Sequence, residues 1–143
     1  MKRISLLGST GSIGCSTLDV IGSYPEEFIV TALAAGRNVG LLKSQIERFR
    51  PRLAAVVDEE HAFELRRLLN VNSAPAVFFG PEGDREVAAA AGTDLVVSAM
   101  VGAVGLIPTL EAIEAGKTVA LANKETLVMA GSIVLRKAEA KGI

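Results

Sequence analysis

The chain has 143 residues, a formal net charge of −1 and a sequence pI of about 5.9. This length suits one domain with a substantial buried core, and the lack of a basic excess argues against a nucleic-acid-binding surface. No apolar run is long enough to span a bilayer, and the first apolar segment begins too close to Met1 for a signal peptide, so we expect a cytoplasmic protein without a membrane partner. A single cysteine, Cys15, excludes an internal disulfide and a cysteine metal cluster.

Short apolar segments alternate with helix-like segments along the whole chain. The 50% of hydrophobic residues are mostly Ala, Val, Leu and Ile, which suits parallel strands covered on both faces by helices. The expected strands are residues 4–7, 28–34, 53–57, 76–79, 95–99 and 119–122. The expected helices are residues 16–23, 39–49, 60–70, 85–91, 108–115 and 126–141, and residues 80–83 are expected to form a turn. This alternation predicts an α/β fold, a doubly wound parallel sheet (Rossmann-like) in three layers, α/β/α.

The turn after the first strand is rich in glycine. Its sequence is Gly8-Ser9-Thr10-Gly11-Ser12-Ile13-Gly14, and a helix-like run follows it. Glycines let the backbone approach a ligand closely, and the free N–H groups and dipole of a helix N-terminus attract phosphate oxygens. The spacing differs from the usual dinucleotide pattern and lacks the lysine of a P-loop. A diphosphate site is one interpretation, and a glycine-rich turn without a ligand is the other.

The second strand is followed by Ala35-Gly36-Arg37-Asn38. An NAD-binding domain places an acidic residue at this point to hold the ribose 2′-hydroxyl. Arg37 occupies the position instead, and a guanidinium can pair with a 2′-phosphate. The sequence therefore favours NADP over NAD, unless Arg37 is simply a solvated surface side chain.

Small and polar residues follow the last two strands. Gly102 and Gly105 lie after the fifth strand, where they permit either close approach to a nicotinamide or tight packing of a helix. Asn123, Lys124 and Glu125 follow the sixth strand abruptly. They are candidates for a ligand site at the carboxyl edge of the sheet, and Asn123 is equally suited to cap a helix whose first turn contains Glu125.

Together these motifs resemble the amino-terminal domain of the 1-deoxy-D-xylulose 5-phosphate reductoisomerase family. The resemblance covers the whole chain, in order, and is carried by residues 8–14, 35–38, 102–106 and 121–125. It implies an NADP-dependent oxidoreductase of isoprenoid biosynthesis. The family rearranges 1-deoxy-D-xylulose 5-phosphate to a branched aldehyde and reduces it with NADPH to 2-C-methyl-D-erythritol 4-phosphate, using a divalent cation.

The resemblance also implies roles for individual residues. The residues expected to contact NADPH are Thr10, Gly11, Ser12, Ile13, Gly36, Arg37, Asn38, Asn123 and Glu125. Lys124 is expected to bind the sugar phosphate substrate. The family's metal ligands, for Mg, Mn or Co, come from a catalytic domain that follows this one, with a helical domain after it. Residues 1–143 are therefore expected to form an NADPH-binding domain that is inactive alone, without catalytic or metal-binding residues, and the full-length enzyme is expected to be a homodimer.

Two other functions fit part of the sequence. A stand-alone nucleotide-binding or regulatory module would have the same glycine turn, but no pocket for a partner domain beside Lys124. Another two-domain NADP oxidoreductase, of the dihydrodipicolinate reductase or aspartate semialdehyde dehydrogenase type, would share the fold. Such an enzyme is not expected to contain Leu121-Ala122-Asn123-Lys124-Glu125.

Overall fold

The computed structural model describes all residues, 1–143, and contains one parallel sheet of six strands. The strands are β1 (Lys2–Leu7), β2 (Phe28–Ala34), β3 (Leu53–Val56), β4 (Ala76–Phe79), β5 (Leu95–Ser98) and β6 (Thr118–Leu121). Their order in the sheet is β4-β3-β2-β1-β5-β6. The winding therefore reverses between β1 and β5, and such a switch point opens a crevice at the carboxyl ends of the strands.

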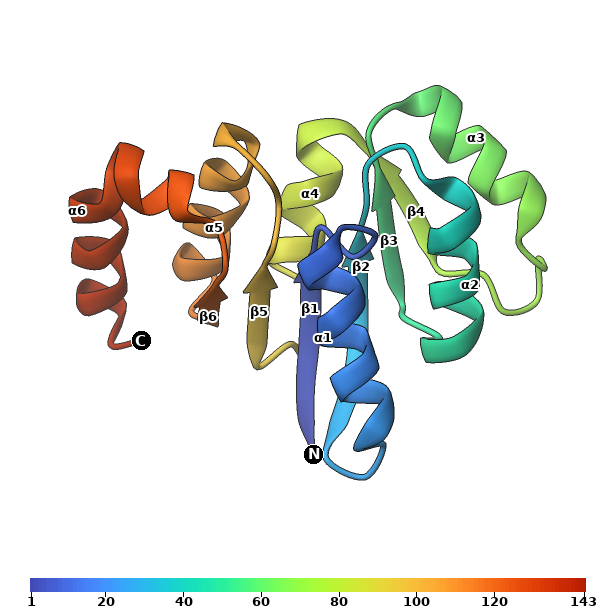
Figure 1. Ribbon diagram of the computed structural model, residues 1–143, viewed down its shortest axis with the longest axis horizontal. Helices are drawn as coiled ribbons and strands as arrows, with labels where there is room; N and C mark the ends of the chain where they lie inside the picture. The colour runs from blue at the N-terminus through green and yellow to red at the C-terminus, as the bar shows by residue number, and fades with distance from the viewer.

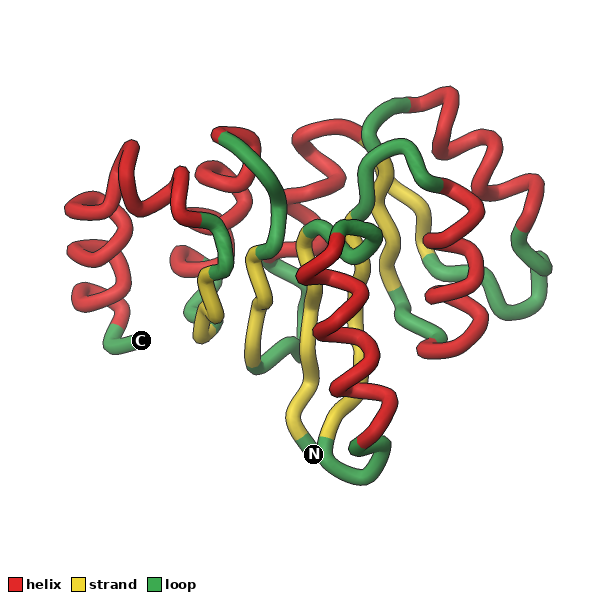
Figure 2. The backbone as a smooth tube through the Cα atoms, in the orientation of Figure 1, coloured by secondary structure: helices red, strands yellow, loops and turns green.

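Six helices and one short 3₁₀ turn connect the strands. The helices are α1 (Ser12–Ser23), α2 (Val39–Phe49), α3 (Glu59–Leu68), α4 (Gly80–Ala88), α5 (Leu106–Glu114) and α6 (Lys124–Lys141), and the 3₁₀ turn η1 (Ala103–Gly105) precedes α5. The loops that lead from β1, β2, β5 and β6 into the next helix lie at the upper edge of the sheet in Figure 2. None of the helices combines the length and apolar character that crossing a membrane requires.

The sheet is covered on both faces because successive residues of a strand point to opposite sides. Leu6 of β1 packs with α1, α2 and α3 on one face, whereas its neighbour Leu7 packs with α4 and α5 on the other. The front and rear helices are visible in Figure 1. Both leucines are fully buried, so this alternation confirms the three-layered, doubly wound fold expected from the sequence.

Helix α6 lies beyond β6, at the outer end of the sheet (Figure 1). It packs against α5, where Glu114 forms ion pairs with both Lys137 and Lys141. Its axis is kinked at Ala130, whose backbone is not helical (φ −147°, ψ 27°). Several apolar side chains of this helix are exposed, among them Val128 at 83%.

One predicted segment was wrong, and several helix boundaries shifted. Residues 80–83 form the first turn of α4 rather than a separate turn, and that helix ends at Ala88 instead of residue 91. Pro81 lacks an N–H group, which costs nothing in the first turn of a helix because the N–H groups there have no partner within the helix. Glu82 suits the positive end of the helix dipole. Helix α1 begins at Ser12, four residues before the expected start at residue 16, and α4 begins at Gly80, five residues before the expected start at residue 85. The remaining boundaries differ by no more than two residues.

Candidate functional site

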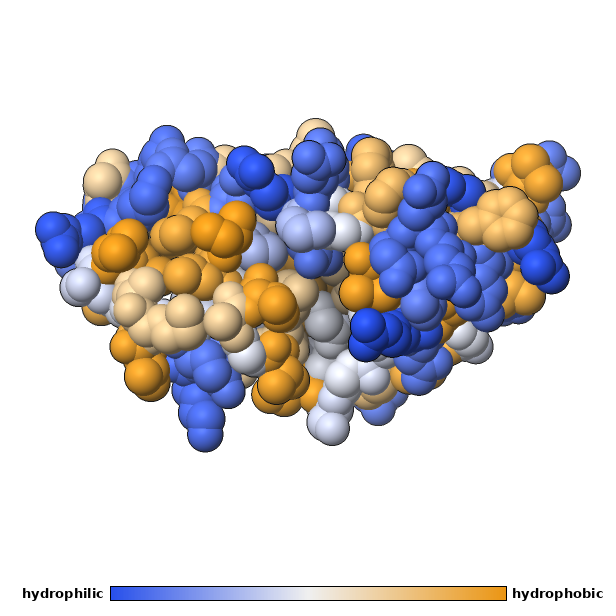
Figure 3. Space-filling model, turned by 90° about the horizontal axis from the view of Figure 1, so that it is seen from above, coloured by the Kyte–Doolittle hydropathy of each residue, from blue (hydrophilic) through white to orange (hydrophobic).

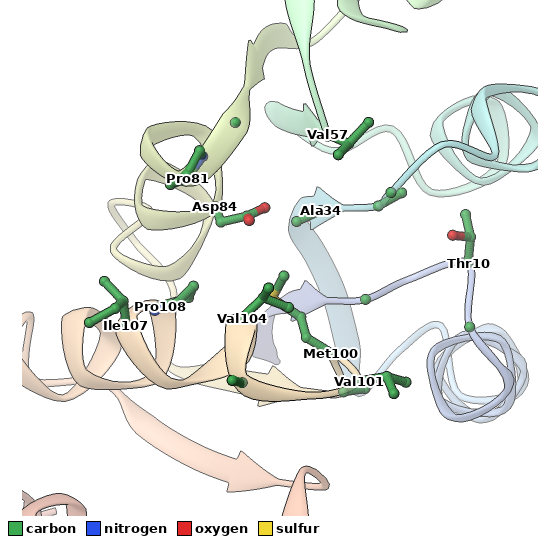
Figure 4. A pocket seen from close by; sticks show the side chains of 17 residues that line it. Thr10, Ala34, Val57, Pro81, Asp84, Met100, Val101, Val104, Ile107 and Pro108 are labelled. Carbon is green, nitrogen blue, oxygen red and sulfur yellow. The ribbon is translucent and has the colours of Figure 1, made fainter. Parts of the chain in front are cut away.

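A cleft of about 570 Å³ lies at the carboxyl ends of the central strands, over the switch point between β1 and β5 (Figure 4). Its wall is almost entirely apolar or glycine, and Thr10 and Asp84 are its only polar side chains. The lining residues are Gly8, Thr10, Gly11, Ala34, Ala35, Gly36, Val57, Gly80, Pro81, Asp84, Ala99, Met100, Val101, Ala103, Val104, Ile107 and Pro108. An apolar wall that begins at a glycine turn suits a flat organic ring joined to a phosphate.

The glycine turn allows α1 to begin very close to the end of β1. A Cβ atom on Gly14 would lie 2.1 Å from the carbonyl oxygen of Gly8, and one on Gly8, where φ is +84°, would lie 2.6 Å from that of Ala99. Both positions therefore exclude a side chain. Gly11 precedes α1 and provides no side-chain cap, so no side chain accepts from the N–H groups of the first turn. These groups lie beside the cleft, and free N–H groups at a helix N-terminus are the donors that hold a diphosphate.

A buried side chain from α2 supports this turn. The amide Nε2 of Gln45 donates a hydrogen bond to the carbonyl oxygen of Ser9. Ser9 is completely buried and Gln45 is 7% exposed. Gln45 was not predicted from the sequence, since an amide within an amphipathic helix has no pattern that distinguishes it from a surface residue.

The loop after β2 places Gly36 in the wall of the cleft and leaves Arg37 and Asn38 exposed. The Asn38 side chain accepts a hydrogen bond from the N–H of Leu41, so it caps α2. The pKa of Asp58 is lowered mainly by hydrogen bonds with His61 and further by the charge of Arg37. The Arg37 guanidinium therefore lies near the start of α3, free of any ion pair of its own.

Asn123 links α6 to the loop after β5. Its Oδ1 accepts from the N–H of Thr126 at 3.2 Å, and its Nδ2 donates to the carbonyl oxygen of Gly102 at 2.9 Å. A Cβ atom on Gly105 would lie 2.5 Å from that Nδ2, so the small residue here makes room for the Asn123 amide. The capping interpretation of Asn123 and the packing interpretation of Gly105 both hold, and neither excludes a ligand. Lys124 is exposed and Glu125 half-buried at the start of α6.

Asp84 is the one ionisable residue in the wall of the cleft. It lies on α4, and its carboxylate points into the cleft toward Ala34 (Figure 4). Burial raises the pKa of this carboxyl to about 6 from an ordinary value of 3.8, and no charged group contributes to the shift. Asp84 was not predicted from the sequence, because residues 80–83 were expected to form a turn and Asp84 then lies outside the expected helix.

The structure therefore brings part of the predicted site together. Thr10, Gly11 and Gly36 line one cleft, although they come from two loops. The other predicted cofactor and substrate residues, Ser12, Ile13, Arg37, Asn38, Asn123, Lys124 and Glu125, do not line it, and their roles stay predictions. No group of three or more histidine, cysteine, aspartate and glutamate side chains could hold a metal ion.

The face at the carboxyl ends of the strands is divided between two kinds of surface (Figure 3). Hydrophobic side chains gather over the half that carries α5 and α6, whereas hydrophilic side chains dominate over α2 and α3. The exposed apolar residues of the first half include Val101, Val104 and Ile107 of the cleft and Val128 and Met129 of α6. A contiguous apolar surface beside a cleft is typical of a site that another part of a protein covers.

Comparison with known proteins identifies the family. The family model of 1-deoxy-D-xylulose 5-phosphate reductoisomerase matches residues 4–131. The enzyme of that name from Chlorobium phaeobacteroides is 57% identical over 134 residues, which is 94% of this chain but 35% of that protein. The chain thus spans about a third of the length of the curated relatives that it matches.

Solved structures agree with the sequence match. A DOX-P reductoisomerase in complex with NADPH, fosmidomycin and magnesium superposes with a TM-score of 0.93 at 36% identity, over 99% of this chain and 35% of that one. The Zymomonas mobilis enzyme in complex with NADPH superposes with a TM-score of 0.92 at 38% identity, over 99% of this chain and 37% of that one. On the fold, the glycine turn and these matches, the chain belongs to the 1-deoxy-D-xylulose 5-phosphate reductoisomerase family.

Proposed function

We propose that this chain is the NADPH-binding part of an enzyme that converts 1-deoxy-D-xylulose 5-phosphate to 2-C-methyl-D-erythritol 4-phosphate. The observation that carries the proposal is the glycine turn between β1 and α1, where a side chain at Gly8 or Gly14 would collide with backbone atoms. The uncapped first turn of α1 opens beside the apolar cleft. Two solved relatives, each superposing on 99% of this chain, hold NADPH.

The residues present fit each chemical part of NADPH. Thr10, Gly11, Ser12 and Ile13 would hold the diphosphate at the first turn of α1, since they offer backbone N–H groups and two hydroxyls. Gly36, Arg37 and Asn38 would hold the ribose with its 2′-phosphate, to which only Arg37 brings a positive charge. Asn123 and Glu125 would lie toward the nicotinamide. When bound, NADPH supplies the electrons that reduce the aldehyde.

The remaining chemistry belongs to the whole enzyme. Lys124, exposed at the start of α6, would bind the sugar phosphate. The divalent cation needs clustered oxygen ligands, which we place in the catalytic domain that follows this one in the family, before a helical domain. One solved relative holds magnesium and fosmidomycin together with NADPH. A homodimeric assembly of the full-length enzyme and a cytoplasmic location stay predictions.

A pair of measurements on the 143-residue chain tests the proposal. NADPH fluorescence should change on titration with the chain and reach saturation. No NADPH should be oxidised when 1-deoxy-D-xylulose 5-phosphate and Mg²⁺ or Mn²⁺ are added, since the metal ligands are expected elsewhere. Failure to bind NADPH would overturn the assignment, and steady oxidation would show that the active site is misplaced. Binding of NADPH by the 143-residue chain does not separate this proposal from the other oxidoreductase types. The full-length enzyme does so, because it should use this sugar phosphate as its substrate.

A further inference from the structure

The Asp84 carboxylate forms no ion pair with any positively charged side chain of the protein. No hydrogen bond or ion pair includes its carboxylate, which faces a cleft whose other side chains are apolar except for Thr10. A carboxylate in an apolar wall costs free energy unless a donor satisfies it. The other acidic residues of α4, Glu82 and Glu86, are exposed to solvent, so Asp84 alone of the three bears this cost.

No titratable group on the neighbouring elements compensates Asp84. Arg85, the next residue of α4, points to the other side, where it pairs with Glu111 of α5. At this point β2 contributes Ala34, the loop after β3 contributes Val57, and the loop after β5 contributes Met100. Within the protein, the Asp84 carboxylate therefore has solvent or a ligand as its only possible partner.

The position of the cleft indicates which part of a dinucleotide would meet Asp84. From the glycine turn the cleft extends past Gly36, in the loop proposed to hold the ribose with the 2′-phosphate, and past Ala34 to Asp84. The base on that same ribose is adenine, and apolar walls such as Val57 and Met100 suit a flat heterocycle. Adenine carries an exocyclic amine at C6, which is a hydrogen-bond donor, whereas a carboxylate is an acceptor.

We propose that Asp84 selects the purine of the dinucleotide, because its carboxylate accepts a hydrogen bond from the exocyclic amine of adenine. The inference rests on the proposed binding of NADPH. It assigns the adenine end of the cofactor to the cleft and makes Asp84 a specificity-determining residue for that end. The amine would provide the partner that the carboxylate lacks within the protein.

Nicotinamide hypoxanthine dinucleotide phosphate, in its reduced form, tests the proposal by titration of the 143-residue chain. This analogue has a carbonyl oxygen at C6 and a hydrogen on N1, where NADPH has the amine and an unprotonated N1, and is otherwise the same molecule. The wild-type chain should bind NADPH about 10- to 100-fold more tightly, since the analogue sets an acceptor against the Asp84 carboxylate. In Asp84→Asn the ratio should fall close to one, because an amide can accept from the amine or donate to the carbonyl oxygen.

Three variants and a folding check complete the design. Asp84→Ala should also lose the discrimination, and Glu86→Gln, an identical loss of charge on the same helix, should keep it. The melting temperature of each variant establishes that it is folded. A wild-type ratio near one, with NADPH still bound, would overturn the role of Asp84 and leave the proposed function intact, as would an unchanged ratio in folded Asp84→Ala. Absence of NADPH binding by the wild type would overturn both.

Discussion

The Nε2 atom of Gln45 lies 2.8 Å from the carbonyl oxygen of Ser9, so the middle of α2 is tied to the turn in front of α1. Substitution by methionine removes this donor from a buried carbonyl, which costs about 1–3 kcal/mol. The Oε1 atom of Gln45 is buried without a partner, and its removal offsets part of that loss. We therefore expect Gln45→Met to lower the free energy of unfolding by about 1 kcal/mol and to weaken NADPH binding several-fold.

Urea denaturation and fluorescence titration would measure the two effects of Gln45→Met. The control is Ser44→Ala, on the exposed side of the same helix, which should leave NADPH affinity unchanged. An unaltered NADPH affinity in Gln45→Met would show that the turn does not need this support.

Gly14→Ala should disrupt the chain far more than an ordinary glycine-to-alanine change. The new methyl group would lie 2.1 Å from the carbonyl oxygen of Gly8, which is backbone and cannot rotate away. We expect a loss of more than about 2 kcal/mol in the free energy of unfolding, or no folded protein. Gly131→Ala, within α6 and with open space around it, should instead stabilise the chain by about 0.5–1 kcal/mol. Equal effects of the two changes, measured by chemical denaturation, would contradict the packing described for the glycine turn.

The preference for NADPH over NADH should depend on Arg37. The guanidinium is exposed on the loop after β2 and has no ion pair in the structure, so it is available for a 2′-phosphate. Arg37→Asp should weaken NADPH binding on the order of 10- to 100-fold, the value of a charge-assisted contact, and leave NADH binding nearly unchanged. Calorimetric titration with both cofactors measures this, with Arg67→Asp on exposed α3 surface as the charge control. Equal affinity of the wild type for NADPH and NADH would refute the assignment of Arg37.

Asp84 should make the chain without ligand less stable as the pH rises from about 4 to about 6. The folded-state pKa is raised to about 6, above the ordinary value of 3.8, so the folded state retains a proton that the unfolded state has lost in this window. Stability is full below pH 3.8 and is lost as the pH rises through about 6. Asp84→Asn should remove this slope and gain about 1–2 kcal/mol at pH 7, a figure reduced for partial exposure. Denaturation curves at four pH values measure it, and parallel profiles for wild type and variant would contradict the burial of this carboxyl.

Lys124 should act on the substrate rather than on the cofactor. It lies exposed at the first residue of α6, outside the wall of the cleft. In the full-length enzyme, Lys124→Ala should lower kcat/KM for the sugar phosphate by about 2–4 kcal/mol of transition-state stabilisation, with little change in the NADPH dissociation constant. Lys124→Arg keeps the positive charge but replaces the compact ammonium by a planar guanidinium, and it should recover part of the activity. The reverse pattern, weak NADPH binding with normal substrate kinetics, would assign Lys124 to the cofactor phosphates.

The sequence predicted the strands well and the site in part. Runs such as Leu53–Val56 are apolar on both faces, and burial on both faces is what a central parallel strand requires. The glycine turn was equally legible, since Gly14 is imposed by contacts with the nearby Gly8 and Ser9, although the atoms nearest a Cβ at Gly8 belong to the distant Ala99. Gln45 and Asp84 were not predicted, because each matters through a partner or cavity formed by distant segments. No local pattern distinguishes such a residue from a solvated side chain on a helix.

The two hydrogen bonds of the Asn123 side chain make α6 and the loop after β5 a single mechanical unit. One bond holds the first turn of α6, and the other holds the carbonyl of Gly102, next to Val101 and Ala103 in the wall of the cleft. A tilt of α6 must therefore either break one of these bonds or carry that wall with it. A domain or protein that packs on the exposed apolar side chains of α6 can therefore change the width of the cleft.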